Sequence, residues 1–160
     1  MAVTSPTPER LALQQALSTC RGHRDGLVDA LTDMPQPPAD AGALAHLTRD
    51  DRRVLDQFAY RYTRLQDDMG NRLLPAILRA LGEDIAVMST IDRLARLEQL
   101  GWIPSADEWL ELRRLRNEFS HEYPLAPEER LERLRLAFAA ARRLLAMLAD
   151  IEQRIHARLG

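Results

Sequence analysis

The sequence predicts an all-α protein, on three observations. The apolar residues, 46% of the 160-residue chain, are carried by Leu and Ala, which are strong helix formers, whereas aromatic residues make up only 5%. Apolar residues recur at spacings of three and four, the period of a helix with one buried face. No stretch alternates apolar and polar residues as a half-buried strand would. We therefore expect a single domain over residues 1–160, built as an antiparallel bundle of about five helices.

The first predicted helix has a well-marked start. Thr7 is a suitable N-cap, Pro8 suits the first helical position, and Glu9 places an acid in the first turn. This helix should run to about Met34. The prolines that follow predict a loop over residues 35–47.

A second, longer helix is predicted to begin after Thr48, where residues 48–51 resemble a capping box with Asp in place of Glu. Its apolar stripe consists of Val54, Phe58, Tyr62, Leu65, Met69, Leu73 and Ile77. Pro75 falls inside this run, where it removes a backbone donor and crowds the previous turn. We therefore expect a kink at Pro75 or a break near Gly70.

Three further helices complete the predicted bundle. Ser89 opens a short one, which Gly101 closes. Ser105 begins a clear capping box that opens the next helix. Pro124 ends that helix, because a residue before proline is pushed out of the α region. A last, long helix should follow over residues 127–159.

Composition narrows the possible functions. The net charge of −2 gives no general reason to expect nucleic-acid binding, and all 22 residues counted as Lys or Arg are arginine. Cys20 is the only cysteine, so neither a disulfide framework nor a cysteine metal site is expected. No apolar run approaches the length of a membrane span, and the N-terminal residues lack an apolar signal region. We expect a cytoplasmic protein with no metal or cofactor and no membrane association.

The segment RLRNEFSHEYP, residues 114–124, is the candidate for chemistry. On an undisturbed helix Arg116 and His121 would point about 140° apart, at roughly 100° per residue, so they would not share a face. The helix should, however, end between residues 120 and 123. A second copy of this helix, packed across a two-fold axis, could also bring the Arg of one chain beside the His of the other. The site is therefore expected between the protomers of a homodimer.

The residue types in this segment suit RNA cleavage without a metal. Histidine can transfer protons in both directions near neutral pH. Arginine stays charged and can donate to the non-bridging oxygens of a phosphate as negative charge builds up. Asn117 could hold the histidine or a ribose hydroxyl through a hydrogen bond. The implied reaction is attack of the RNA 2′-hydroxyl on its own phosphate, which gives a 2′,3′-cyclic phosphate and a free 5′-hydroxyl.

The spacing of Arg116, Asn117, His121 and Tyr123 resembles the Arg-x4-His-x-Tyr motif of HEPN-domain proteins, and most closely that of HepT-like toxins paired with minimal nucleotidyltransferase (MNT) antitoxins. The resemblance extends to the helical layout from Thr48 onward. It implies a HEPN-like bundle that dimerises and acts as an endoribonuclease toxin of a toxin-antitoxin pair. Arg116 and His121, supported by Asn117, would be its catalytic residues. It also implies that the MNT antitoxin silences the toxin by adding AMP to Tyr123 (AMPylation).

Charged neighbours bear on this prediction in both directions. Arg113 and Arg114 lie within a turn or two of the motif and could recruit a phosphate chain, whereas Glu118 and Glu122 would oppose it. The alternative is a non-catalytic helical binding module that presents a surface, or Tyr123, to a nucleotidyltransferase partner.

The adjacent acids Asp67 and Asp68 resemble a paired-carboxylate site. Adjacent residues of a helix diverge by about 100°, so the two cannot both face one ion. We expect both carboxylates to be mainly solvated, with the alternative that one faces the cleft and pairs with an arginine.

Overall fold

The computed structural model describes residues 5–121 and 126–160, and within these ranges the chain forms helices and turns without strands. The elements are, in chain order, α1 (Pro8–Asp33), α2 (Ala41–Ala45), α3 (Arg49–Asp68), the π-helical turn η1 (Met69–Leu73), α4 (Leu74–Ala80), the 3₁₀ turn η2 (Ile85–Val87), α5 (Thr90–Gln99), α6 (Ala106–Ser120) and α7 (Pro127–Leu159). The all-helical fold predicted from the sequence is confirmed. None of these helices combines the length and apolarity that a membrane span requires.

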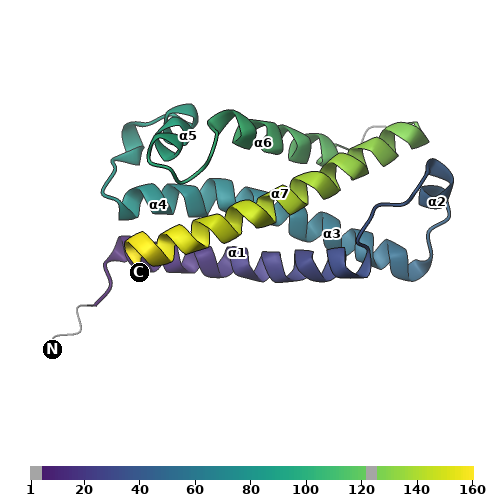
Figure 1. Ribbon diagram of the computed structural model, residues 1–160, viewed down its shortest axis with the longest axis horizontal. Coiled ribbons are helices and arrows are strands. Elements are labelled where there is room, and N and C mark those ends of the chain that lie inside the picture. Colours follow the sequence, from purple (N-terminus) through teal and green to yellow (C-terminus); the bar gives the residue numbers. More distant parts are fainter. Residues whose placement is uncertain (1–4, 122–125) are drawn as a thin grey trace.

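The long helices form a bundle in which successive members alternate in direction (Figure 1). α1 packs along α3 and α4, and α6 lies on the opposite side of α3. α7 crosses the bundle diagonally and contacts α1, α2, α3 and α6. Counting the continuous run from α3 through η1 to α4 once, the described ranges contain five helices of ten residues or more, as expected, beside the short α2.

The predicted helix starts are confirmed at the level of single hydrogen bonds. At each, a side-chain hydroxyl accepts a hydrogen bond from the backbone N–H three residues later, which satisfies a donor that the first turn leaves without an acceptor. The capping residues are Thr7, Thr48, Ser89 and Ser105. The predicted stop at Gly101 is also observed, and this glycine has a positive φ of 78°.

The expectation of a plain loop over residues 35–47 was wrong in one part, because α2 lies inside it. The carboxylate of Asp40 caps this helix by accepting a hydrogen bond of 2.7 Å from the N–H of Ala43. Leu44 packs against the core, and α2 lies against α7. The prediction of a loop rested on the prolines alone. It did not take into account the capping residue Asp40 and the helix-forming alanines that follow it.

The prediction of a local disturbance around Gly70 and Pro75 is confirmed, and it takes the form of the π turn η1. Pro75 has no N–H to donate and would crowd the carbonyl one turn earlier in a regular helix. The chain widens instead, so that the N–H of Leu74 donates to the carbonyl of Met69, five residues back. The helix therefore continues without a break. Such single π turns occur frequently at functional sites.

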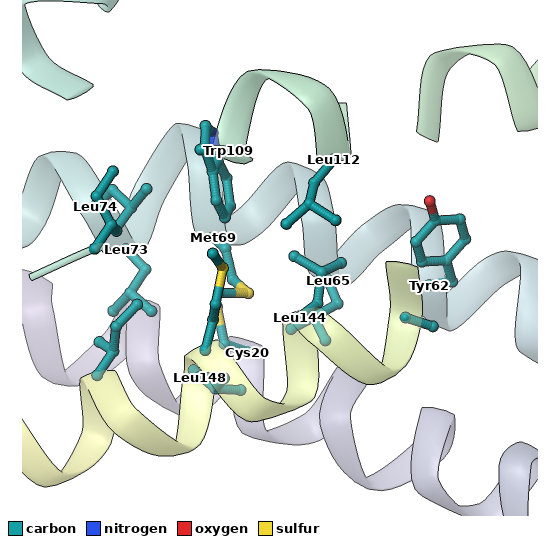
Figure 2. Close-up of a cluster of buried hydrophobic side chains, with 14 of the residues drawn as sticks. Cys20, Tyr62, Leu65, Met69, Leu73, Leu74, Trp109, Leu112, Leu144 and Leu148 are labelled. Atoms are coloured by element: carbon teal, nitrogen blue, oxygen red, sulfur yellow. The ribbon is translucent and has the colours of Figure 1, made fainter. Parts of the chain in front are cut away.

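The core confirms the predicted stripe, which runs from α3 through η1 into α4 and of which every member except Val54 is buried. Figure 2 shows buried side chains from different helices meeting there. The labelled members include Cys20 of α1, Leu65 of α3, Met69 of η1, Trp109 and Leu112 of α6, and Leu144 and Leu148 of α7. This packing fixes α6 against α3, and thereby positions the polar residues that lie between them.

Cys20 provides a test of this packing. Burial raises the pKa of its thiol from an ordinary value of 9.0 to about 12, with a further contribution from the Asp68 carboxylate. The folded protein should therefore not react with a disulfide reagent at pH 8, because the thiol is both inaccessible and protonated. The stabilisation associated with the protonated thiol is fully present below pH 9 and should be lost as the pH rises toward 12.

The measurement is the rate of absorbance change with an aromatic disulfide, with and without denaturant. Reaction should be complete within minutes in the unfolded protein. It should be slower by at least about 100-fold in the folded protein, because the reagent reaches the thiol only in the rare molecules that have opened or unfolded. Equal rates would contradict the buried position of Cys20.

Candidate functional site

Helix α6 carries the candidate residues, and its two faces have different roles. Trp109 and Leu112 point into the core and anchor the helix. The polar residues Arg113, Arg116 and Asn117 are three or four positions apart or adjacent, and they lie on the side of α6 that borders α3 and α5. The core anchors therefore determine where the polar side chains lie.

Arg116 forms a two-point ion pair with Asp67 of α3. Its Nε donates to Oδ1 at 2.9 Å and its Nη2 donates to Oδ2 at 2.8 Å. Its Nη1 donates to the hydroxyl of Ser120 at 2.8 Å. The two charged side chains are 20% and 40% exposed, so the pair is accessible from solvent. For Asp67, the structure thus shows the expected alternative, pairing with an arginine in the cleft.

Asp68 has other partners than Asp67, and the expectation that it would be mainly solvated was wrong. Its side chain is 18% exposed. Its Oδ2 lies 3.1 Å from Nε2 of His23, and its Oδ1 lies 3.6 Å from Nε of Arg72. The two adjacent carboxylates therefore face different partners, as the geometry of a helix requires.

His121 lies at the end of α6, as predicted. The last helical residue is Ser120, and His121 follows as the C-cap with an extended backbone (φ −75°, ψ 122°). Its backbone N–H donates to the carbonyl of Glu118 at 3.2 Å. The guanidinium of Arg116 reaches Ser120, the residue directly before His121. The two motif residues thus belong to the same end of α6, although they are five positions apart in sequence.

A pocket of about 430 Å³ opens between the α3–η1 segment, α5 and α6. This volume lies within the range of small-ligand sites. The lining residues used below are Gln66, Asp67, Thr90, Arg93, Trp109, Arg113, Arg116 and Asn117. The pocket therefore contains three of the residues that the sequence singled out on α6, namely Arg113, Arg116 and Asn117.

The other predicted residues lie elsewhere. Arg114 is on an exposed face, where it pairs with Glu111 and Glu118, and it does not line the pocket. The hydrogen bond that Arg114 donates to Glu111 lowers the pKa of the Glu111 carboxyl. Glu118, which was expected to oppose phosphate binding, is neutralised by Arg114. Tyr123 lies outside the described residues.

Among the pocket residues that were not identified from the sequence, Gln66 and Arg93 have buried polar atoms. Gln66 is only 3% exposed and is the buried polar residue of the core. The signal that could have revealed it is its position four residues after Tyr62, on the buried side of α3. Arg93 gave no comparable signal, because its burial arises from the packing of α5 against α4 and α6.

Comparisons of the chain with protein-family models, with curated proteins and with solved structures found no match. Among the described residues no group of three or more His, Cys, Asp or Glu side chains is arranged to hold a metal ion. What the geometry offers is a helical bundle with an arginine-lined pocket beside a helix end that carries a histidine.

Proposed function

We propose that this protein is a HEPN-like, metal-independent endoribonuclease toxin that acts in the cytoplasm as a homodimer and is silenced by an MNT antitoxin. The observation that supports this best is the arrangement at the end of α6. Arg116 is held at the edge of a polar pocket by Asp67 and Ser120, and His121 follows directly after Ser120. A positioned guanidinium and an imidazole at one helix end suit phosphodiester cleavage, in which charge builds up on phosphate oxygens and protons are transferred.

In the proposed reaction the RNA 2′-hydroxyl attacks the adjacent phosphorus. A bond forms between phosphorus and O2′, and the bond between phosphorus and O5′ breaks. His121 accepts the hydroxyl proton, and Arg116 stabilises the charge that builds up on the non-bridging oxygens. Asn117, which lines the pocket, holds the histidine or the ribose. DNA lacks the attacking hydroxyl and should not be cleaved.

The same reaction explains why two protomers are proposed. One group must remove the proton from the 2′-hydroxyl while another delivers a proton to the leaving O5′. One chain supplies one His121, and a two-fold axis near the end of α6 would supply a second imidazole. A dimer built in this way has twice the 18.2 kDa mass of one chain.

Tyr123 is the proposed site of silencing. It follows His121 by two residues in the sequence. AMP attached to its hydroxyl would bring a phosphate and considerable bulk to the place where the RNA phosphate must bind. The antitoxin would therefore block substrate binding without unfolding the toxin.

A second candidate function has an observation in its favour. All three guanidinium nitrogens of Arg116 are already engaged, two by Asp67 and one by Ser120. An arginine of this kind can serve to lock α6 to α3. In that case the protein would be a non-catalytic HEPN-like binding module for the nucleotidyltransferase. RNA cleavage itself distinguishes the two functions.

The test is incubation of AMP-free protein with RNA in EDTA. Wild-type protein should cleave RNA, leave DNA intact and produce 2′,3′-cyclic phosphate and 5′-hydroxyl ends. Arg116→Ala should reduce the rate by about 10²- to 10³-fold, the typical effect of removing a donor that stabilises a developing oxyanion. Arg10→Ala is the control, at an exposed arginine of α1, and it should leave the rate within a factor of about two, because Arg10 does not line the pocket. Intact RNA after incubation with wild-type protein would favour the binding module.

A further inference from the structure

The pocket is lined by a buried amide whose oxygen has no hydrogen-bond donor among the described residues. Gln66 lines the pocket at 3% exposure, and its Oε1 has no partner among the residues that the structure describes. A buried acceptor without a donor costs about 1–3 kcal/mol. A bound group that offers a donor would recover this free energy.

A second unused group lies on α5. The Nε–H of Arg93 is buried and has no acceptor among the described residues. The same guanidinium is held by its Nη2, which donates to the carbonyl of Ile85 at 2.8 Å. Arg93, a residue of the pocket wall, is therefore fixed in position with one donor that no described residue uses.

The charges of the pocket define the kind of ligand. Arg93, Arg113 and Arg116 contribute three positive charges, and Asp67 contributes one negative charge. The excess is positive although the chain as a whole is slightly acidic, so the pocket favours an anion. The hydroxyl of Thr90 adds a neutral donor and acceptor.

The amide of Gln66 indicates which kind of anion the pocket binds. It presents one acceptor and one donor side by side, and this arrangement pairs with the edge of a nucleobase, as glutamine does with adenine in nucleic-acid recognition. Inorganic phosphate would satisfy the arginines and leave the amide unused. A volume of about 430 Å³ is of the size that accommodates one small ligand, and not a folded nucleic acid.

We propose that the pocket between α3, α5 and α6 binds one nucleotide, with the base edge on Gln66 and the phosphate on the arginines. The nucleotide is either free in solution or a unit of the RNA chain. The second case rests on the proposed function, and there the pocket selects which base is bound next to the scissile phosphate. The nucleotide site itself does not depend on cleavage.

The experiment uses the wild-type protein in EDTA with ¹⁵N labelling. AMP, GMP, CMP, UMP and inorganic phosphate are titrated separately. The signals to follow are the side-chain amide of Gln66, the Nε–H of Arg93 and the indole N–H of Trp109. At least one mononucleotide should shift all three signals, with a dissociation constant at least tenfold below that of phosphate. The proposal is overturned if no mononucleotide shifts these signals at millimolar concentration.

Substitutions then test the contacts. Gln66→Met keeps the side-chain length, Arg93→Met keeps the side chain as far as the position of Nε, and both remove the polar groups. Each should weaken mononucleotide binding by about 10- to 100-fold, the value of a bidentate contact to a base or of a charge-assisted hydrogen bond. The matched control is Gln153→Met, an exposed glutamine of α7. Wild-type affinity in both pocket variants would overturn the proposal. The signals of the unsubstituted protein decide the question if a variant does not fold.

A competition distinguishes the two sources of the nucleotide. A short 2′-O-methyl RNA cannot be cleaved, because its 2′-oxygen cannot attack. If this RNA displaces the bound mononucleotide, the pocket takes a unit of the RNA chain. If it does not, the pocket takes a free nucleotide. Both results support the nucleotide site, and the separate assay in EDTA shows whether RNA cleavage occurs, so the failure of one proposal is not mistaken for the failure of the other.

Discussion

Replacing His121 with alanine should lower the rate of RNA cleavage by about 10²- to 10⁴-fold, which is the usual contribution of a general acid or base. Without the imidazole the proposed general base is gone, and the guanidinium of Arg116 cannot replace it because it stays protonated. The side chain is exposed at the C-cap, so its loss should change the melting temperature by no more than a few degrees. The measurement is kcat/KM on a short RNA in EDTA.

The control for this change is His156→Ala, a histidine that is exposed near the end of α7. It should leave kcat/KM within a factor of about two, because surface substitutions away from a site have small effects. Both variants should have the mass of the wild-type protein by light scattering, which for the proposed assembly is that of a dimer. Undiminished cleavage by a folded, dimeric His121→Ala protein would exclude the proposed catalytic role.

Replacing Leu144 with alanine should destabilise the fold by about 2–5 kcal/mol, the range for a buried leucine that leaves a cavity behind. Leu144 of α7 is fully buried and lies beside Leu65 and Leu112 at the point where α7, α3 and α6 meet (Figure 2). For a chain of this size the melting temperature should fall by roughly 5–15 °C. Urea unfolding followed by circular dichroism gives the free-energy difference directly.

Leu136→Ala is the matched control on the same helix. Leu136 is 37% exposed, so the substitution creates no enclosed cavity, and the expected change is below about 1 kcal/mol. If the two leucines gave equal losses, the packing of α7 across the bundle would not be as the structure shows it.

The helix starts could be predicted from the sequence because each depends on residues that are close in the chain. Thr48 and Ser105, for example, cap donors only three positions away. The disturbance at Pro75 is local for the same reason. Helix α2 was missed because two local signals conflicted there, the prolines of a loop and the cap supplied by Asp40.

The candidate site could be predicted only in part. The motif indicated Arg116 and His121, but the partner of Arg116 is Asp67, 49 residues earlier in the chain, and no periodic pattern specifies a contact at that separation. The geometry of a helix showed that Asp67 and Asp68 must diverge, and it did not show which partner each would take. Gln66 and Arg93 become pocket residues only when α6 packs against α3, and α5 packs against α4 and α6.

The π turn η1 has a further consequence for how this chain can vary. A turn with one residue more than an α-helical turn shifts the angular phase of everything that follows it by about one position. Gln66 and Asp67 before the turn, and Leu74 and Pro75 after it, line the same pocket with this extra residue in place. Loss of a single residue between Met69 and Leu73 would rotate one of these two groups away from the pocket. The length of this short segment is therefore as constrained as the identity of its side chains.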